Sequence, residues 1–220
     1  TLTPLLAIKA GGGHAAYQIA RVHGFFAEDV SRHEGALRAA ALEKRPCGIL
    51  RVLACRGTSG GLAAHFDALL AALRAPSCQV RELWLVGCDW PEGRALSELV
   101  EALPARGLKA LAVADMQVGG ALPAALFEKC AEAVFVSLQD MAFTGGIPAS
   151  VGKCSKVEWL LLDTNQLEGA VPASELAKLT ALQALCLVQN EGLTITASGK
   201  QEIMSAAPTA KFFWPRVVDA

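Results

Sequence analysis

The sequence predicts an α/β fold in which short repeated units stack into a solenoid with a parallel β-sheet on its concave side. An apolar pattern recurs at nearly constant spacing: Leu160 and Leu162 are matched 24 residues earlier by Val136 and Leu138. Several consecutive matches at one period indicate a repeat rather than one buried strand. In addition, 53% of the residues are hydrophobic and only 19% are charged, which favours a folded chain with a large core.

Each unit follows the same order of residue types. The unit at 157–172 has apolar residues, one Asn and a closing Gly-x-Val-Pro at Val157, Leu160, Leu162, Asn165, Leu167, Gly169, Val171 and Pro172. Matching units end at Pro148 and Pro123. This pattern resembles the leucine-rich repeat, and the closing Gly-x-Val-Pro resembles its plant-type variant. The resemblance implies a leucine-rich-repeat solenoid whose common activity is protein recognition on the concave face.

The Asn position of the repeat has a physical reason. The chain turns away from the strand there, and a buried side-chain amide can bond the backbone groups that the turn leaves unpaired. Asn165 and Asn190 provide this amide, whereas Cys88, Met116 and Met141 occupy the equivalent position in other units. We therefore expect amide bonding at only two turns.

Residues 1–49 lack the repeat and are expected to form a helical N-terminal cap, since an open solenoid end would expose its core. A strand at 5–8 and helices at 14–26 and 28–44 are expected from apolar spacing and composition. The solenoid is assigned to residues 50–214 and a C-terminal tail to 215–220.

About six repeats are expected, in two classes. The units before Leu108 are longer and resemble the ribonuclease-inhibitor type, with strands near 50–55 and 80–88 and helices near 62–73 and 95–103. Later units have only short convex pieces, because Pro123, Pro148 and Pro172 restrict helix formation. The expected elements there are 124–128, 149–153, an irregular repeat at 193–197, a helix at 199–206 and a final aromatic strand at 211–215.

Alternation along the strands places every second residue on the concave face. This face is unusually apolar and aromatic, which is typical of an interaction surface. The candidate partner-binding residues are Trp84, Val86, Phe135, Gln139, Trp159, Leu161, Asp163 and Val188. In the first unit the same reasoning assigns Val52, Ala54 and Arg56 to this face. Two alternatives remain: the chain's own tails or cap cover the face, or a one-residue register slip exchanges the two faces.

Catalytic, cofactor and metal sites are not predicted. His14, His23, His33 and His65 form no recognised ligand spacing, and a surface position on helices explains them. Gly11–Gly13 before a helix leaves a small-ligand or nucleotide-binding module at Gly11–His14 as an alternative function. The expected role is a non-enzymatic scaffold or accessory subunit.

Charge and cysteine content constrain the partners and the compartment. The net charge of −1 gives no electrostatic attraction for nucleic acid, so a protein partner in a stable complex is expected. No apolar run approaches the roughly 20 residues that span a bilayer, although a partner within a membrane complex stays open. Seven cysteines without Cys-x-x-Cys pairs indicate buried thiols and an intracellular or organellar chain that has lost its leader. An extracellular receptor or inhibitor fragment is the alternative.

Overall fold

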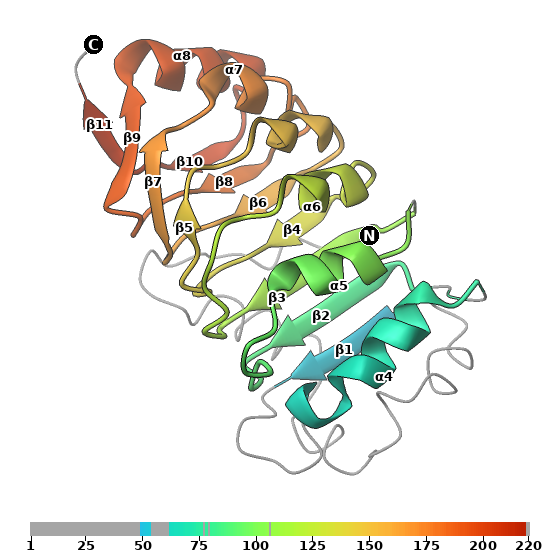
Figure 1. Ribbon diagram of the computed structural model, residues 1–220. Coiled ribbons are helices and arrows are strands. Elements are labelled where there is room, and N and C mark those ends of the chain that lie inside the picture. The colour runs from blue at the N-terminus through green and yellow to red at the C-terminus, as the bar shows by residue number, and fades with distance from the viewer. Residues whose placement is uncertain (1–48, 54–61, 77, 79, 106, 219–220) are drawn as a thin grey trace.

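The computed structural model describes residues 49–53, 62–76, 78, 80–105 and 107–218, which form a stack of repeated units with two parallel sheets (Figure 1). The large sheet contains, in spatial order, β1 (Ile49–Leu53), β2 (Glu82–Val86), β3 (Ala110–Ala114), β4 (Phe135–Ser137), β6 (Trp159–Leu161), β8 (Ala184–Cys186) and β10 (Lys211–Phe213). Spatial order follows chain order, because each unit adds one parallel strand beside the previous one. The predicted parallel sheet is confirmed.

The small sheet was not predicted. It contains, in spatial order, β11 (Arg216–Val218), β9 (Gly192–Thr196), β7 (Gln166–Ala170) and β5 (Thr144–Gly145). These strands follow the turns of the later units, so the closing Gly-x-Val-Pro segments also line up side by side. The segment expected to be a C-terminal tail contains β11, which pairs with β9 and continues the small sheet.

The helical pieces lie on one face of the large sheet (Figure 1). They are α4 (Leu62–Arg74), α5 (Leu96–Ala102), α6 (Ala124–Lys129), the 3₁₀ helix η1 (Ala149–Lys153), α7 (Ala173–Leu176) and α8 (Ala197–Ala206). Pro123, Pro148 and Pro172 occupy the N-cap positions of α6, η1 and α7. The expected shortening of the helices after residue 108 is confirmed up to α7.

The main core lies between the large sheet and the helices. The repeat residues expected to point inward are buried there; Leu83, Val136, Leu160 and Leu185 each expose 0% of their surface. A single unit could not hide these side chains, and stacking buries each row against its neighbours. The predicted hydrophobic spine is confirmed.

The turn after each strand repeats one backbone conformation. Asp115, Asp140, Thr164 and Gln189 all have positive φ, between 51° and 57°. This left-handed conformation costs energy for a residue with a Cβ atom, although Asp tolerates it better than most residues. Its recurrence at every later unit indicates that the stack imposes the turn. The residue that follows is the Met or Asn position of the repeat.

The first unit corrects one prediction. Strand β1 pairs with β2 so that Arg51 is opposite Trp84 and Val52 is opposite Leu85. Since Leu85 belongs to the main core, Val52 occupies an inward register position, and its assignment to the concave face was wrong. The spacing from Leu50 to its partner Leu83 is 33 residues, whereas the apolar pattern had suggested 30. Ala54, Arg56 and the expected N-terminal cap lie outside the described residues.

The C-terminal end of the main core has the expected aromatic cover. The rings of Phe212 and Trp214 stack with centroids 5.0 Å apart, and both pack against the main core. Lys200 of α8 places its ammonium group 5.6 Å from the Trp214 ring centroid. None of the helices in the described part of the chain is long and apolar enough to cross a membrane.

Candidate protein-interaction surface

A second apolar cluster lies on the face of the large sheet that is turned away from the helices. We call it the strand-face cluster; it contains Trp84, Val86, Ala110, Ala112, Ala114, Phe135, Trp159, Leu161, Ala184 and Cys186, with Val188 and Phe213 at its margin. Six of the eight predicted partner-binding residues belong to it. The alternation of the strands therefore places these side chains on one surface, as the sequence indicated.

The centre of the strand-face cluster is an aromatic pair. Trp84 on β2 and Phe135 on β4 are two strands apart, a distance of about 10 Å between backbones. Their ring centroids are nevertheless only 5.1 Å apart and the rings are inclined by 24°. Ala110 and Ala112 on the intervening β3 make this contact feasible, because small side chains leave room for the rings to meet above them. The alanines of β3 thus form the floor of an aromatic surface.

The strand-face cluster is buried, although it contains residues of the strands and their following turns only. Trp84 exposes 3% of its surface, Phe135 4% and Trp159 9%. All buried hydrophobic residues of the helices in the described ranges belong to the main core instead. The face is therefore apolar as predicted, but it is closed to solvent rather than open.

A polar chain borders the strand-face cluster where β4 and β6 end. The Ser137 hydroxyl donates to Gln139 Oε1 at 3.0 Å, and Gln139 Nε2 donates to both carboxylate oxygens of Asp163 at 2.7 and 2.9 Å. The Thr164 hydroxyl lies 2.7 Å from Gln189 Oε1, to which it donates. Gln139 and Asp163, which the sequence assigned to partner binding, thus bond each other and are 3% and 6% exposed.

Burial sets the ionisation of Asp163. The pKa of its carboxyl is raised above the usual 3.8, because burial disfavours the charged form more than the hydrogen bonds from Gln139, Cys186 and Thr164 favour it. Since the pKa is higher in the folded chain than in the unfolded chain, the folded chain binds the proton more tightly. This contribution to stability is present at low pH and is lost as pH rises from about 3.8 through the raised pKa.

We expect Asp163→Asn to remove this pH-dependent component. The wild-type chain should lose part of its free energy of unfolding as pH rises above 4, and the variant should lose less over the same range. Urea unfolding midpoints measured between pH 4 and pH 7 test this. Glu168→Gln, which neutralises an exposed carboxylate, is the control and should keep the wild-type slope. An Asp163→Asn slope equal to that of the wild type would contradict the assignment.

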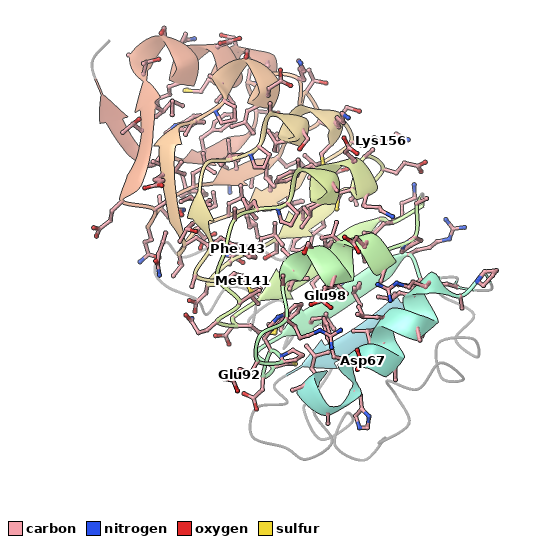
Figure 2. The ribbon with its side chains drawn as sticks, viewed as in Figure 1. Asp67, Glu92, Glu98, Met141, Phe143 and Lys156 are labelled. Atoms are coloured by element: carbon pink, nitrogen blue, oxygen red, sulfur yellow. The ribbon has the colours of Figure 1, made fainter. Side chains whose placement is uncertain are left out.

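The Asn positions hold two turns together. Asn165 Oδ1 accepts hydrogen bonds from the backbone N–H groups of Met141 and Phe143, both at 3.1 Å. These two residues lie on the loop between β4 and β5 (Figure 2). Asn165 Nδ2 donates to the carbonyl oxygens of Leu138 and Leu162 at 2.8 and 3.0 Å. The predicted bonding of turn backbone by a buried amide is confirmed here and at Asn190, whose Oδ1 accepts from the Leu167 N–H.

The thiols are arranged for packing. Cys78, Cys88, Cys130, Cys154 and Cys186 are free thiols, and all but Cys78 are buried. Burial raises the pKa of the Cys154 thiol to about 12, and burial with the nearby Cys154 raises that of Cys130. A protonated buried thiol is a poor nucleophile. The prediction of buried structural thiols is confirmed for Cys88, Cys130, Cys154 and Cys186. Cys47 and Cys55 lie outside the described residues.

In the described part of the chain, no group of three or more His, Cys, Asp or Glu side chains could hold a metal ion. His65 is half-buried on α4, while His14, His23, His33 and the turn at Gly11–His14 lie outside the described residues.

Phe213, at the margin of the strand-face cluster, was not among the predicted partner-binding residues. The sequence pattern could have identified Phe213, because β10 pairs with β8 so that Phe213 is opposite Cys186, a residue of the strand-face cluster.

Comparisons with known proteins give a structural likeness without a sequence match. No protein-family model matches the chain, and no curated protein matches it. The plant peptide hormone receptor RGFR1 in complex with RGF2 resembles 61% of this chain, with a TM-score of 0.51 and 20% identity over 20% of the receptor chain. A TDR receptor resembles 69% of this chain, with a TM-score of 0.50 and 16% identity over 28% of that chain.

A third similar structure is the LRR ectodomain of the Arabidopsis receptor kinase HAESA, in complex with an IDA peptide hormone. The match includes 69% of this chain and 28% of the HAESA chain, with a TM-score of 0.47 and 20% identity. The chain thus spans less than a third of the length of these receptors. At such identities the likeness concerns the fold, and it supports a leucine-rich-repeat fold for the described residues. The division into plant-type and ribonuclease-inhibitor-like units stays a prediction.

Proposed function

We propose that this chain is a non-enzymatic protein-recognition module, a scaffold or accessory subunit that binds a protein partner through the strand-face cluster. The observation that carries the proposal is an aromatic and aliphatic surface that continues across β2, β3, β4, β6 and β8. Trp, Phe and Leu side chains held on a rigid sheet are the residues around which binding energy concentrates. Stacked repeats characteristically present such extended surfaces.

The chemistry of the strand-face cluster favours protein over other ligands. Its side chains are apolar, and its border carries the carboxylate of Asp163 rather than a basic group. Nucleic acid binding would require a positively charged stripe, whereas the chain has a net charge of −1. An apolar segment of another protein, such as the buried face of an amphipathic helix, fits this surface best.

The burial of the strand-face cluster sets a condition on binding. With Trp84 at 3% exposure, a partner reaches the centre of the face only when the surroundings of this ring rearrange. Val188 and Phe213 at the margin are half-buried and offer the first contact. We therefore expect association to be slow relative to an open surface, since binding that requires a conformational change has a reduced association rate.

The proposal is tested with a pair of matched variants. Val188 packs against the strand-face cluster, and Val118 is equally half-buried but packs against the main core. In chain purified from its native source, we expect a complex heavier than the 23.0 kDa of the chain alone. Val188→Lys should release most of the bound partner, because it introduces a charge into the apolar surface, whereas Val118→Lys should retain it. Native mass spectrometry measures both, and an undiminished complex in a folded Val188→Lys variant would remove the proposal.

The thiols support an intracellular or organellar setting for this module. Five free cysteines occur in the described ranges, and four of them are buried in the packing of the repeats. An extracellular receptor fragment would be expected to pair its cysteines, because oxidising compartments favour disulfides. The alternative of a nucleotide-binding module at Gly11–His14 concerns a turn outside the described residues and gains no support from the rest of the chain.

A further inference from the structure

One buried position of the repeat lies at the end of each helical piece, just before the chain turns into the next strand. In four consecutive units Leu103, Cys130, Cys154 and Leu179 occupy it, and each exposes 2% of its surface or less. The backbone N–H groups of Leu103, Cys154 and Leu179 each bond the carbonyl oxygen three residues earlier, which shows that the local structure repeats. Since leucine fills the position in the flanking units, packing alone does not require a thiol in the two central ones.

The two units that carry these thiols are held in register on two sides. In the large sheet β4 pairs with β6, and in the small sheet β5 pairs with β7. Cys130 lies five residues before β4 and Cys154 five residues before β6, so the two cysteines are equivalent positions. The spacing of paired strands, about 4.8 Å, therefore also sets the two Cα atoms about 5 Å apart. The Cα atoms of a disulfide are about 4.4–6.8 Å apart, so this pair meets the requirement.

The thiol groups also approach each other across the contact between α6 and η1. Cys154 Sγ donates a hydrogen bond to the carbonyl oxygen of Phe127 at 3.3 Å. Phe127 lies in the last turn of α6, three residues before Cys130, so the Cys154 thiol reaches the turn that Cys130 ends. In addition, Cys154 is near enough to contribute electrostatically to the raised pKa of Cys130. The side chains of the two cysteines are therefore neighbours within the main core.

We propose that Cys130 and Cys154 are a disulfide-forming pair that links two adjacent units of the stack when the chain folds or opens under oxidising conditions, and that the closed stack shields. In the structure both thiols are free, so it represents the reduced form. The bridge closes a loop that contains β4, β5 and η1. This modification site depends on the repeat, because the stacking of equivalent positions brings the two cysteines together.

The oxidant that the step requires is a small-molecule disulfide, for which glutathione disulfide is the probe. The thiolate of one cysteine attacks glutathione disulfide, forms a mixed disulfide and releases one glutathione. The second cysteine then attacks the protein sulfur of the mixed disulfide and releases the second glutathione. The protein gives up two electrons and two thiol protons, and both are carried away by the two molecules of reduced glutathione.

The closed stack slows this exchange. Both side chains expose 0% of their surface, and burial raises the pKa of the Cys154 thiol to about 12, so hardly any reactive thiolate is present. Exchange therefore requires an opening of the units around α6 and η1, which exposes the thiols to water and to the oxidant. We expect the pair to be oxidised during folding or local unfolding rather than in the intact stack.

A second buried cysteine serves as a comparison. Cys186 on β8 is opposite Leu161 and Phe213 in the two adjoining strands, so no cysteine occupies its equivalent position in either unit. Cys186 is thus a buried thiol of the same stack without an equivalent thiol beside it. The inference does not depend on the proposed function, since a disulfide can form whether or not the strand-face cluster binds a partner.

Disulfide mapping in the full chain tests the inference. The chain is incubated with glutathione disulfide either while folded or during refolding from urea. Remaining thiols are blocked with N-ethylmaleimide, and the chain is digested with trypsin without reduction. Cleavage after Lys129, Lys153 and Lys156 places the two cysteines in separate peptides, 130–153 and 154–156. A bridge is therefore detected by mass spectrometry as these two peptides joined, and the urea midpoints of the oxidised and reduced monomers are compared.

The joined peptides are expected to dominate after refolding and to form at least about tenfold more slowly in the folded chain, which exposes the thiols only when it opens. The oxidised monomer should have a higher urea midpoint, because the bridge restricts the unfolded chain. Cys154→Ala should abolish both the joined peptides and the rise in midpoint, whereas Cys186→Ala should keep both. Circular dichroism under reducing conditions establishes that each variant is folded.

Several results would overturn the inference. Free thiols or glutathione adducts at Cys130 and Cys154 after refolding, without the joined peptides, would show that the two sulfur atoms do not meet. Either cysteine joined mainly to a third cysteine or to another molecule would exclude this pair, and a lower urea midpoint would show that the bridge does not fit the stack. Equal rates in the folded and refolding chain would exclude shielding. These measurements use the unsubstituted chain, so they decide the matter even if a variant does not fold.

Discussion

Replacing Asn165 with alanine should lower the free energy of unfolding by about 3–5 kcal/mol, because it leaves several buried backbone groups without partners. The amide satisfies the N–H groups of Met141 and Phe143 and bonds the carbonyl oxygens of Leu138 and Leu162. Water cannot replace these bonds easily, since Asn165 exposes 8% of its surface. Because whole domains are stable by only about 5–15 kcal/mol, this single change removes a large share of stability.

Two comparisons make the Asn165 prediction specific. Asn190→Ala should cost less, because Asn190 Oδ1 accepts from one backbone N–H group instead of two. Gln166→Ala, at the exposed neighbouring position, should change the free energy of unfolding by less than about 0.5 kcal/mol. Urea unfolding followed by circular dichroism gives all three values. A cost below about 1 kcal/mol for Asn165→Ala would show that the turn does not depend on the amide.

Leu160→Ala and Leu161→Ala should each cost about 2–5 kcal/mol, even though the two side chains point to opposite faces of β6. Leu160 is 0% exposed in the main core and Leu161 is 1% exposed in the strand-face cluster. Truncation of either leaves a cavity in a closed environment, and the lost transfer and contact energies are similar. The pair is a matched comparison, because the substitution, the strand and the burial are the same.

The Leu161 result separates a closed face from an open one. On a surface that only a partner covers, Leu161→Ala would cost the purified chain little, since the side chain would be solvated before and after truncation. Urea midpoints at one pH decide between these results. A cost for Leu161→Ala below about 1 kcal/mol, beside a normal cost for Leu160→Ala, would mean that the strand-face cluster is open in solution.

The regular part of the stack was predictable because each unit repeats one short-range pattern. From Leu83 onward, apolar residues at fixed positions identify both the core side of each strand and the side away from the helices. The prediction was wrong for the first unit. Leu50, Leu53 and Cys55 fit the repeat with a 30-residue spacing that aligns Leu53 with Leu83, but backbone pairing places Leu50 opposite Leu83. An odd shift of three residues exchanges the faces of a strand, so Val52 was assigned to the wrong side.

The small sheet could not be predicted for a different reason. In β7, Gln166–Ala170, only Leu167 is buried, so the strand has no alternating apolar pattern to recognise. In β5 only two residues pair, and they are Thr144 and Gly145. Strands of this kind form because the stacking of successive units brings their backbones within hydrogen-bonding distance. Their existence depends on the repeat rather than on their own side chains.

The sequence alone determined the repeat, the inward rows of Leu and Val, and the use of Asn at two turns. From β2 onward it also determined which side chains share the strand-face cluster. These features follow from periodicity, which is a local property of the chain. The tertiary structure decided the register of β1, the pairing of the small sheet, and the burial of Trp84, Phe135 and Trp159. Burial depends on contacts between residues that are far apart in the sequence, and such contacts leave no periodic signal.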